Sequence, residues 1–352
     1  MRVEPRSALQ RRELLLLLGA AALAACGGET AKPAASTAGD AADGAGGAGP
    51  GDAVVDAASG ADADAAQDVA PADPTRLVVL NYNVMCSFCK NSDFPQWEHS
   101  WKVRVPWLAD VVERYNPDLV GLQELNDLGI AEGSPDEATQ ILGTTKWETY
   151  YYRSKLGDAF EFDYPDACIS WRKTRFELLE TGQFWLSPEP DTAYSVGFAK
   201  GMQFPRLVVW VRLKDKASGR EISFANTHFD NNSPSQELSA PLSLQRLATV
   251  AAKAPLIFCG DFNSAPKSKA YGLLTGGTPK LIDTYNIAKL QTQESNAKPT
   301  PAWSEPSRID HVFVTESLQC EKWSIDLWRY GQQQQAPSDH PGAVVAHLLW
   351  PL

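Results

Sequence analysis

Short apolar runs with polar ends predict an alternation of strands and helices from residue 75 onward. Residues 77–84 are nearly all apolar until their end, which is typical of a strand buried on both faces. Apolar residues recur at helical spacing over 108–115, the pattern stops at Asn116-Pro117, and 118–122 predicts a second strand. The same reasoning predicts a helix over 244–251 and strands at 167–172, 206–213, 221–228, 256–260, 309–314 and 343–348. This order indicates an α/β (α+β) architecture with mixed sheets.

The first 26 residues have the pattern of an export signal. Four arginines precede an apolar run, Leu14–Ala25, that is too short to span a bilayer and suits the apolar region of a signal peptide. The run ends in Leu23-Ala24-Ala25-Cys26, which resembles the lipobox of bacterial lipoproteins, a family in which the cysteine is lipidated after cleavage. The resemblance implies a signal peptide over 1–25 and a lipid anchor at Cys26. The alternative is an ordinary signal peptide with a chance cysteine.

Residues 26–74 have the composition of a disordered tether. From residue 27 to 74 the chain contains 17 Ala, 9 Gly and 8 Asp and no aromatic residue, so it cannot bury enough apolar surface to offset its ordering entropy. The folded part is therefore 75–352, which is long enough for one large domain. We expect an exported monomer held at the bacterial cell envelope through the membrane anchor.

The acidic balance of the chain argues mildly against avid binding to nucleic acid. The formal net charge is −11, and the part after residue 74 has 27 basic against 32 acidic residues. A local basic groove or bound metal ions can offset so modest a charge. A nucleic-acid substrate therefore stays open.

The six cysteines do not suggest a complete disulfide framework, because five remain if Cys26 carries lipid. Cys86 and Cys89 are spaced for a small disulfide in an oxidising compartment, with a reduced pair or redox and metal chemistry as alternatives. Cys168 and Cys259 lie in apolar strand-like runs and are predicted to be buried thiols.

Polar side chains stand at one end of six predicted strands. Carboxylates, carboxamides and imidazoles in such places commonly mark a site built at one edge of a sheet. The residues are Asn83, Gln123-Glu124, Asn226-Thr227-His228, Gly260-Asp261-Phe262-Asn263, Asp310 and Ser338-Asp339-His340. Each alone is weak, since an Asn near a strand end is most often a cap or turn residue. All six in order are hard to explain as coincidence.

Three of these residues suit a hard divalent cation. Mg²⁺, with Mn²⁺ as a substitute, prefers oxygen ligands, usually one or two carboxylates plus water and substrate phosphate. Glu124 and Asp339 can supply the carboxylates, and Asn83 can supply a neutral oxygen or a supporting hydrogen bond. Zinc is a poorer candidate, because few histidines and no clustered cysteines stand at these ends.

The remaining residues suit hydrolysis of a phosphate ester. Asp261 can orient and deprotonate water, and Asn263 and His228 can donate hydrogen bonds to phosphate. A pairing of His340 with Asp310 would fix the imidazole tautomer and raise the pKa of the histidine.

These motifs resemble the endonuclease/exonuclease/phosphatase superfamily, the fold of deoxyribonuclease I and exonuclease III, over about 77–349. The matching stretches are NYNV at 81–84, PDLVGLQE at 117–124, NTHFD at 226–230, GDFNSAP at 260–266, RIDHVFV at 308–314 and SDHP at 338–341. Residues 172–190 also look like its secreted bacterial branch. The resemblance implies a four-layered α/β sandwich, with two mixed sheets packed face to face and helices outside.

The resemblance also implies a role for each matching residue. The metal-binding residues are Glu124, supported by Asn83 and Asp339, and the catalytic residues are Asp261, Asn263, His228 and the pair His340–Asp310. The division of acid and base roles, and the choice of one metal or two, stay open.

The chain departs from the superfamily pattern in two places. Many relatives have a Glu shortly before the strand that ends at Arg172, where it braces the first catalytic histidine; here Asp166 is the candidate, one position out of step. After NTHFD the chain has Asn231-Asn232, where relatives often carry His or Val. Arg206 and Arg308 could touch phosphate, but a salt-bridged structural arginine is the favoured interpretation of each.

These observations predict a metal-dependent phosphoesterase, with a nuclease or other phosphodiesterase as first choice. Inositol phosphates, phospholipids and small phosphodiesters are the alternative substrates, and a non-catalytic binding lipoprotein is the competing class. The segment 280–305 has no counterpart that can be placed, and its Trp303 is expected near the substrate mouth.

Overall fold

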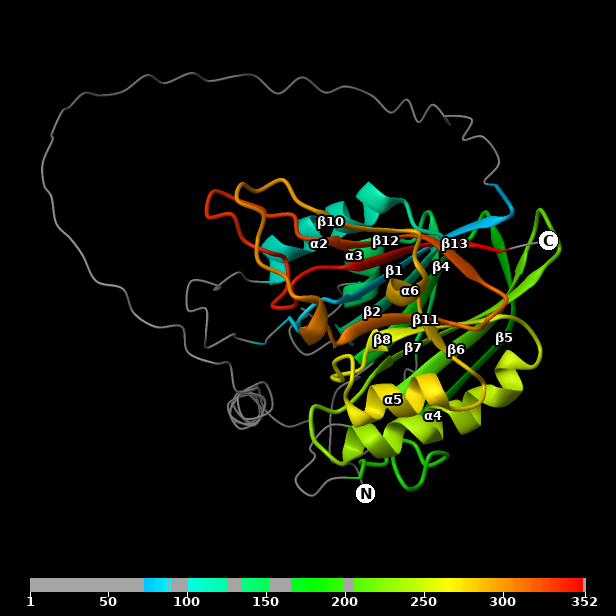
Figure 1. Ribbon diagram of the computed structural model, residues 1–352. Coiled ribbons are helices and arrows are strands. Elements are labelled where there is room, and N and C mark those ends of the chain that lie inside the picture. Colours follow the sequence, from blue (N-terminus) through cyan, green and yellow to red (C-terminus); the bar gives the residue numbers. More distant parts are fainter. Residues whose placement is uncertain are drawn as a thin grey trace, which may run out of the picture. The chain divides into compact units, whose positions relative to one another are not determined.

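The computed structural model describes residues 73–87, 89, 101–125, 135–151, 166–198 and 205–350, which build two β-sheets and the helices around them (Figure 1). The predicted signal peptide, Cys26 and almost all of the tether lie outside these residues. Within them, no helix has both the length and the apolar character needed to cross a membrane.

The first sheet has seven strands. They are β1 (Arg76–Asn83), β2 (Leu119–Leu125), β3 (Trp147–Tyr150), β4 (Asp166–Arg172), β10 (Leu290–Glu294), β12 (Gln319–Asp326) and β13 (Val344–Leu349). Their order across the sheet is β10-β12-β13-β1-β2-β4-β3. β1 runs parallel to β2 and β10 parallel to β12, whereas the other neighbours are antiparallel.

The second sheet has six strands. They are β5 (Phe176–Trp185), β6 (Leu207–Asp215), β7 (Glu221–His228), β8 (Leu256–Asp261), β9 (Ile282–Asp283) and β11 (Asp310–Val314). Their order is β5-β6-β7-β8-β11-β9, and only the β7–β8 pair is parallel.

Helices cover the outer face of each sheet, which makes four layers (Figure 1). They are α2 (Trp101–Tyr115), α3 (Glu137–Leu142), α4 (Ser235–Ala251) and α5 (Lys269–Gly276). The other helical segments are the short α6 (Thr284–Ile287), whose Tyr285 and Ile287 pack against the apolar residues between the sheets, and a 3₁₀ turn (Glu305–Ser307). α2 and α3 pack on the first sheet, and α4 and α5 on the second. The buried apolar residues form three clusters, one between each sheet and its covering helices and one between the two sheets. The predicted four-layered sandwich is confirmed.

All strands predicted from apolar runs are present, with boundaries shifted by at most three residues. Both predicted helices begin earlier, α2 at Trp101 and α4 at Ser235. The strands β3, β5, β9, β10 and β12 were not predicted. In β5 and β12, exposed polar residues interrupt the apolar positions. Cys86 and Cys89 form a disulfide, and Cys168 and Cys259 are buried thiols as expected.

A buried network of side-chain amides joins the two sheets. Gln123 Nε2 donates to Asn81 Oδ1 at 2.8 Å and to Asn226 Oδ1 at 2.6 Å. Asn226 Nδ2 donates in turn to the carbonyl of Cys168, and Asn81 Nδ2 donates to that of Gly260. Because β1, β2 and β4 belong to one sheet and β7 and β8 to the other, these bonds fix how the two sheet edges meet.

Candidate active site

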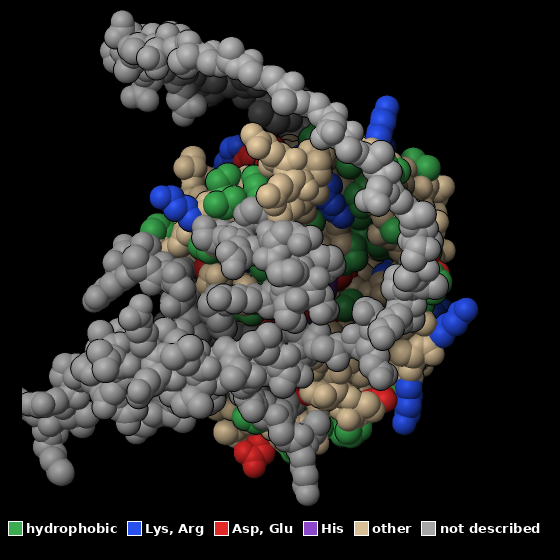
Figure 2. Space-filling view, turned by 90° about the vertical axis from the view of Figure 1, so that its left-hand side faces the viewer, with side chains coloured by type: hydrophobic (Ala, Val, Ile, Leu, Met, Phe, Trp, Pro, Cys, Tyr) green, Lys and Arg blue, Asp and Glu red, His purple; other side chains and the backbone are tan. Residues whose placement is uncertain are grey.

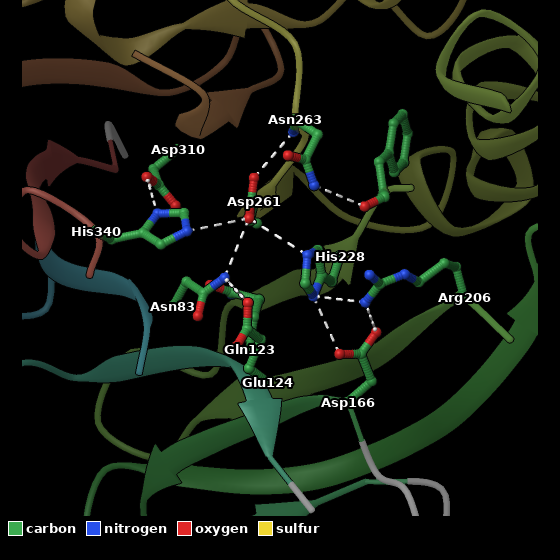
Figure 3. Close-up of polar contacts among 12 residues, drawn as sticks. Asn83, Gln123, Glu124, Asp166, Arg206, His228, Asp261, Asn263, Asp310 and His340 are labelled. Atoms are coloured by element: carbon green, nitrogen blue, oxygen red, sulfur yellow. Dashed lines mark hydrogen bonds and ion pairs between the residues drawn. The ribbon is translucent and has the colours of Figure 1, made fainter. Parts of the chain in front are cut away.

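The predicted site residues gather at one edge of the paired sheets (Figure 3). The parallel pairs β1–β2 and β7–β8 end at this edge, and the antiparallel strands β4, β11 and β13 begin there. Strand direction therefore brings side chains far apart in sequence together. The residues assembled in this way are Asn83, Glu124, Asp166, Arg206, His228, Asp261, Asn263, Asp310 and His340.

Asp261 lies at the centre of the cluster and is buried. Its Oδ2 lies 3.3 Å from His228 Nε2 and 3.4 Å from His340 Nε2, and it accepts a hydrogen bond from Asn83 Nδ2 at 3.1 Å. Its Oδ1 accepts from the backbone N–H of Asn263 at 2.9 Å. A single carboxylate is thus flanked by two imidazoles, an arrangement suited to moving protons.

His340 is braced by Asp310, as predicted. Its Nδ1 lies 2.7 Å from Asp310 Oδ2, which leaves Nε2 directed toward Asp261. Burial lowers the pKa of His340, but the carboxylates of Asp310 and Asp261 outweigh it and raise the pKa well above its ordinary value. The imidazole therefore carries a proton at neutral pH and can donate one.

His228 is braced by Asp166, the residue whose alignment was one position out of step. Asp166 Oδ1 lies 3.0 Å from His228 Nδ1. Arg206 Nη1 donates to Asp166 Oδ2 at 2.8 Å and also lies 2.8 Å from His228 Nδ1. Burial and Arg206 lower the pKa of His228, but Asp166 and Asp261 raise it above its ordinary value. Burial would raise the pKa of Asp166, but Arg206 and His228 lower it to about 2. Arg206 is thus salt-bridged, as favoured from the sequence.

A β-bulge turns Glu124 into the site. The pairing of β2 with β4 shifts between Gln123 and Leu125, and Glu124 itself has a φ of +65°. Bulges and left-handed residues of this kind often re-aim a side chain beside an active site. The freed carboxylate accepts from Asn83 Nδ2 at 2.9 Å and from the backbone N–H of Cys86 at 3.0 Å.

The acidic groups fit a hard cation. Desolvation and the neighbouring Glu124 carboxylate raise the pKa of Asp339, and a divalent cation between the two acids would relieve their repulsion. Asn83 directs its amide nitrogen to Glu124, while its oxygen accepts from the backbone N–H of Met85. The sequence left two roles open for Asn83, an oxygen ligand of the cation or a supporting hydrogen bond. The observed orientation fits the supporting hydrogen bond.

A second group of three potential ligand atoms comes from Asp261, Asp310 and His340, all within 4.8 Å of one another. Both ring nitrogens of His340 already face a carboxylate, Nδ1 that of Asp310 at 2.7 Å and Nε2 that of Asp261 at 3.4 Å.

Asn263 follows Asp261 in a left-handed conformation, with a φ of +47°. Asn is one of the residues that tolerates this region best. Its Nδ2 donates to the carbonyl of Phe229 at 2.9 Å, and its own carbonyl accepts from Gln236 Nε2 at 2.7 Å. These bonds fix the loop between Asp261 and α5. The supporting Gln236 carried no signal in the sequence that pointed to this place.

The sequence matches the model of the Endonuclease/Exonuclease/phosphatase family over residues 99–340. The chain belongs to this family. Carbon catabolite repressor protein 4 homolog 3 of Arabidopsis thaliana is 25% identical over 283 residues, covering 76% of this chain and 57% of its own length. Human nocturnin is 22% identical over 243 residues, and the match covers 64% of this chain and 52% of nocturnin. The chain therefore spans little more than half of either relative.

Solved structures of the family share the fold over nearly their whole length. A family member from Bacteroides thetaiotaomicron has a TM-score of 0.64 at 26% identity, covering 80% of this chain and 97% of its own. A mannosyl-6-phosphatase from the same organism has a TM-score of 0.62 at 26% identity, covering 78% and 99%. The relatives include a 3'-5'-exoribonuclease subunit, Ccr4 of Candida albicans, and this mannosyl-6-phosphatase, so their names indicate more than one class of phosphate ester.

Arg308 is a buried, salt-bridged arginine two residues before Asp310. It pairs with Asp283 and Glu305, and its side chain is buried. Asp283 also accepts from Tyr271 Oη at 3.0 Å and lies 3.1 Å from His311 Nδ1. Burial would raise the pKa of Asp283, but His311 and Arg308 lower it to about 2. Arg308 is therefore a salt-bridged structural arginine, the interpretation that the sequence favoured.

An Asp283→Ala variant is expected to lose about 3–5 kcal/mol of unfolding free energy, because it leaves the Arg308 guanidinium buried without its principal carboxylate. Urea unfolding at pH 7 measures the loss. The matched control is Glu316→Ala, which breaks an exposed pair with Lys280 and should change the free energy by less than about 1 kcal/mol. Equal effects of the two substitutions would contradict this account.

Proposed function

We propose that this chain is a metal-dependent phosphodiesterase at the bacterial cell envelope, with nucleic acid as the first substrate to test. The observation that carries the proposal is the central Asp261 carboxylate oxygen, which lies 3.3 and 3.4 Å from the Nε2 atoms of His228 and His340. Each imidazole is oriented through Nδ1 by a further carboxylate. The envelope location rests on the apolar run and lipobox that end at Cys26.

We assign each residue a part in hydrolysis that its position supports. Asp261 orients a water molecule and accepts its proton, while His228 and Asn263 donate hydrogen bonds to the phosphate oxygens. His340, held protonated by Asp310, donates a proton or a charge-assisted hydrogen bond to the phosphoryl group or its leaving oxygen. The binding of Mg²⁺ or Mn²⁺ by Glu124 and Asp339 would stabilise the developing negative charge.

A cavity of about 330 Å³ supports a substrate with a flat or apolar group. Asp310 and Pro341 line it on the side of the catalytic pair, and Trp303 and Trp323 line it with ring centroids 5.4 Å apart. Trp303 was expected near the substrate mouth. A nucleobase can stack on aromatic walls of this kind. A larger surface groove of about 1080 Å³ lies along β3 and β5, and its lining contains none of the predicted site residues.

The alternative substrates are inositol phosphates, phospholipids and small phosphodiesters. Two observations support these alternatives: the likeness to a mannosyl-6-phosphatase and the excess of acidic over basic residues in the chain. On the visible described surface in Figure 2, Lys and Arg side chains stand singly and make no continuous basic patch. A non-catalytic binding lipoprotein is less favoured, because every family site position holds a chemically competent residue.

Supercoiled plasmid incubated with the purified protein and Mg²⁺ is expected to be nicked, and EDTA or Glu124→Gln should abolish nicking by removing the cation or a carboxylate ligand. Agarose electrophoresis measures nicking. The matched control is Glu148→Gln, which changes an exposed glutamate on β3 and should leave nicking intact. If the wild-type protein is stabilised by Mn²⁺ yet leaves plasmid intact, the nuclease assignment is wrong and phosphoinositides become the next substrates. Nicking that persists in EDTA would contradict the metal requirement.

A further inference from the structure

Arg104 on α2 is a buried cation that hydrogen-bonds to four backbone carbonyls. Its Nη1 donates to the carbonyls of Val84 at 2.6 Å and Pro337 at 3.1 Å, and its Nη2 donates to those of Met85 and Cys86 at 3.0 Å each. The residue is 1% exposed. These bonds use all four hydrogens of the two terminal nitrogens, and only a planar guanidinium can present them as a fork.

The four carbonyls belong to two segments that carry the metal-binding edge. Residues 84–86 directly follow Asn83, and the N–H of Cys86 donates to Glu124 Oε2 at 3.0 Å. The carbonyl of residue 337 directly precedes the segment 338–340. A second tie joins the segments, because Ser338 Oγ donates to the carbonyl of Asn83 at 2.7 Å. Arg104 therefore holds the end of β1 against the loop that carries Asp339 and His340.

Arg104 also stabilises the left-handed backbone conformation of Met85. Met85 has a φ of +56°, a left-handed conformation that costs free energy for a residue with a side chain. Its N–H donates to Asn83 Oδ1, and its carbonyl accepts from Arg104. The two bonds hold the turn that directs the N–H of Cys86 toward Glu124.

The charge of Arg104 faces the same edge. Burial lowers the pKa of Arg104, whereas the carboxylates of Asp339, Glu137 and Glu124 raise it. A buried cation is costly to desolvate, and an apolar residue at this helix position would avoid that cost. The carbonyl contacts account for an arginine here, because no apolar side chain could make them.

We propose that Arg104 is a positioning residue that sets the metal-binding edge, by fixing the end of β1 and the 337–340 loop so that Glu124 and Asp339 converge on a divalent cation. The proposal rests on the proposed function, since the cation is part of it. It assigns Arg104 no contact with substrate.

The test is an Arg104→Lys variant of the full chain, titrated with Mn²⁺ by calorimetry in the absence of substrate. Lysine keeps the charge but cannot reach four carbonyls, so the Kd for Mn²⁺ should rise about 10–100-fold, as for other residues that orient ligands. With bis(p-nitrophenyl) phosphate, raised Mn²⁺ should restore most of the lost kcat. The matched control is Arg175→Lys, which alters a half-buried arginine paired with Asp118 and Asp215 at the opposite end of the strands. It should lower stability in urea and leave the Kd for Mn²⁺ unchanged.

An Arg104→Lys protein that loses stability but keeps the wild-type Kd for Mn²⁺ would overturn the proposal and leave Arg104 a structural residue. If this variant does not fold, Arg104→Gln decides, since it buries no charge and its amide can donate to at most two of the four carbonyls. A raised Kd for Mn²⁺ in Arg104→Gln supports the proposal and an unchanged one overturns it. Absence of Mn²⁺ binding by the wild-type chain would instead contradict the metal requirement of the proposed function, and this proposal with it.

Discussion

Replacing Asp261 with Asn is expected to lower kcat for a phosphodiester by about 10³-fold, within the range for loss of a positioned acid or base. The amide has nearly the same shape and can keep the contact with Asn83 or the N–H of Asn263, but it cannot accept a proton from water. It also removes the negative charge that faces the imidazoles of His228 and His340. The measurement is kcat and KM on bis(p-nitrophenyl) phosphate with Mg²⁺, together with circular dichroism to establish folding.

The matched control for Asp261→Asn is Asp191→Asn, which changes an exposed aspartate paired with Arg246 and should keep kcat within about twofold. A second result separates chemistry from folding. Asp261 raises the pKa of both His228 and His340. As the pH is raised, the residual activity of Asp261→Asn should therefore begin to fall at a lower pH than the activity of the wild type. A folded Asp261→Asn protein that retains kcat within tenfold would show that another group takes the proton.

Strand-end residues could be predicted because they depend on short-range signals. The apolar runs before Asp261 and Glu124 predict buried strands by themselves, and parallel strands place their carboxyl ends at one edge. The fold class followed from the same runs and from the family resemblance. The strands β5 and β12 were not predicted, because only contacts with neighbouring strands show which of their faces is buried.

The residues that hold the site in place could not be predicted in this way. Arg104 lies among polar and apolar residues of a helix, where an arginine is usually exposed, and its partner Pro337 is 233 residues away. The brace at Asp166 depends on the bulge at Glu124, which shifts the register between β2 and β4 and pairs Asp166 with Leu125. Registers and bulges are set by tertiary packing, so one sequence places Asp166 only to within a residue.

The Asp166→Asn variant is expected to lower kcat about 10²-fold and to move the alkaline limb of the pH–rate profile to lower pH. Asp166 accepts from Arg206 on one oxygen and lies 3.0 Å from His228 Nδ1 on the other, whereas an amide can present an oxygen to only one of them. Because Asp166 raises the pKa of His228, loss of its charge lets the imidazolium lose its proton at lower pH. Profiles of kcat on bis(p-nitrophenyl) phosphate from pH 5 to 9 measure both effects.

Stability provides an independent readout for Asp166→Asn. The pKa of Asp166 is about 2 in the folded protein, below the value of about 3.9 for an unfolded aspartate. Its carboxylate therefore contributes about 2–3 kcal/mol to folding above pH 5, and this contribution is lost as the pH falls toward 2. The difference in the free energy of unfolding between the wild type and Asp166→Asn, measured in urea, should accordingly become smaller as the pH falls from 6 to 3. Asp191→Asn should show a small and constant difference, since Asp191 is exposed. A difference for Asp166→Asn that does not change with pH, together with an unmoved alkaline limb, would exclude the carboxylate of Asp166 as the group that holds His228 protonated.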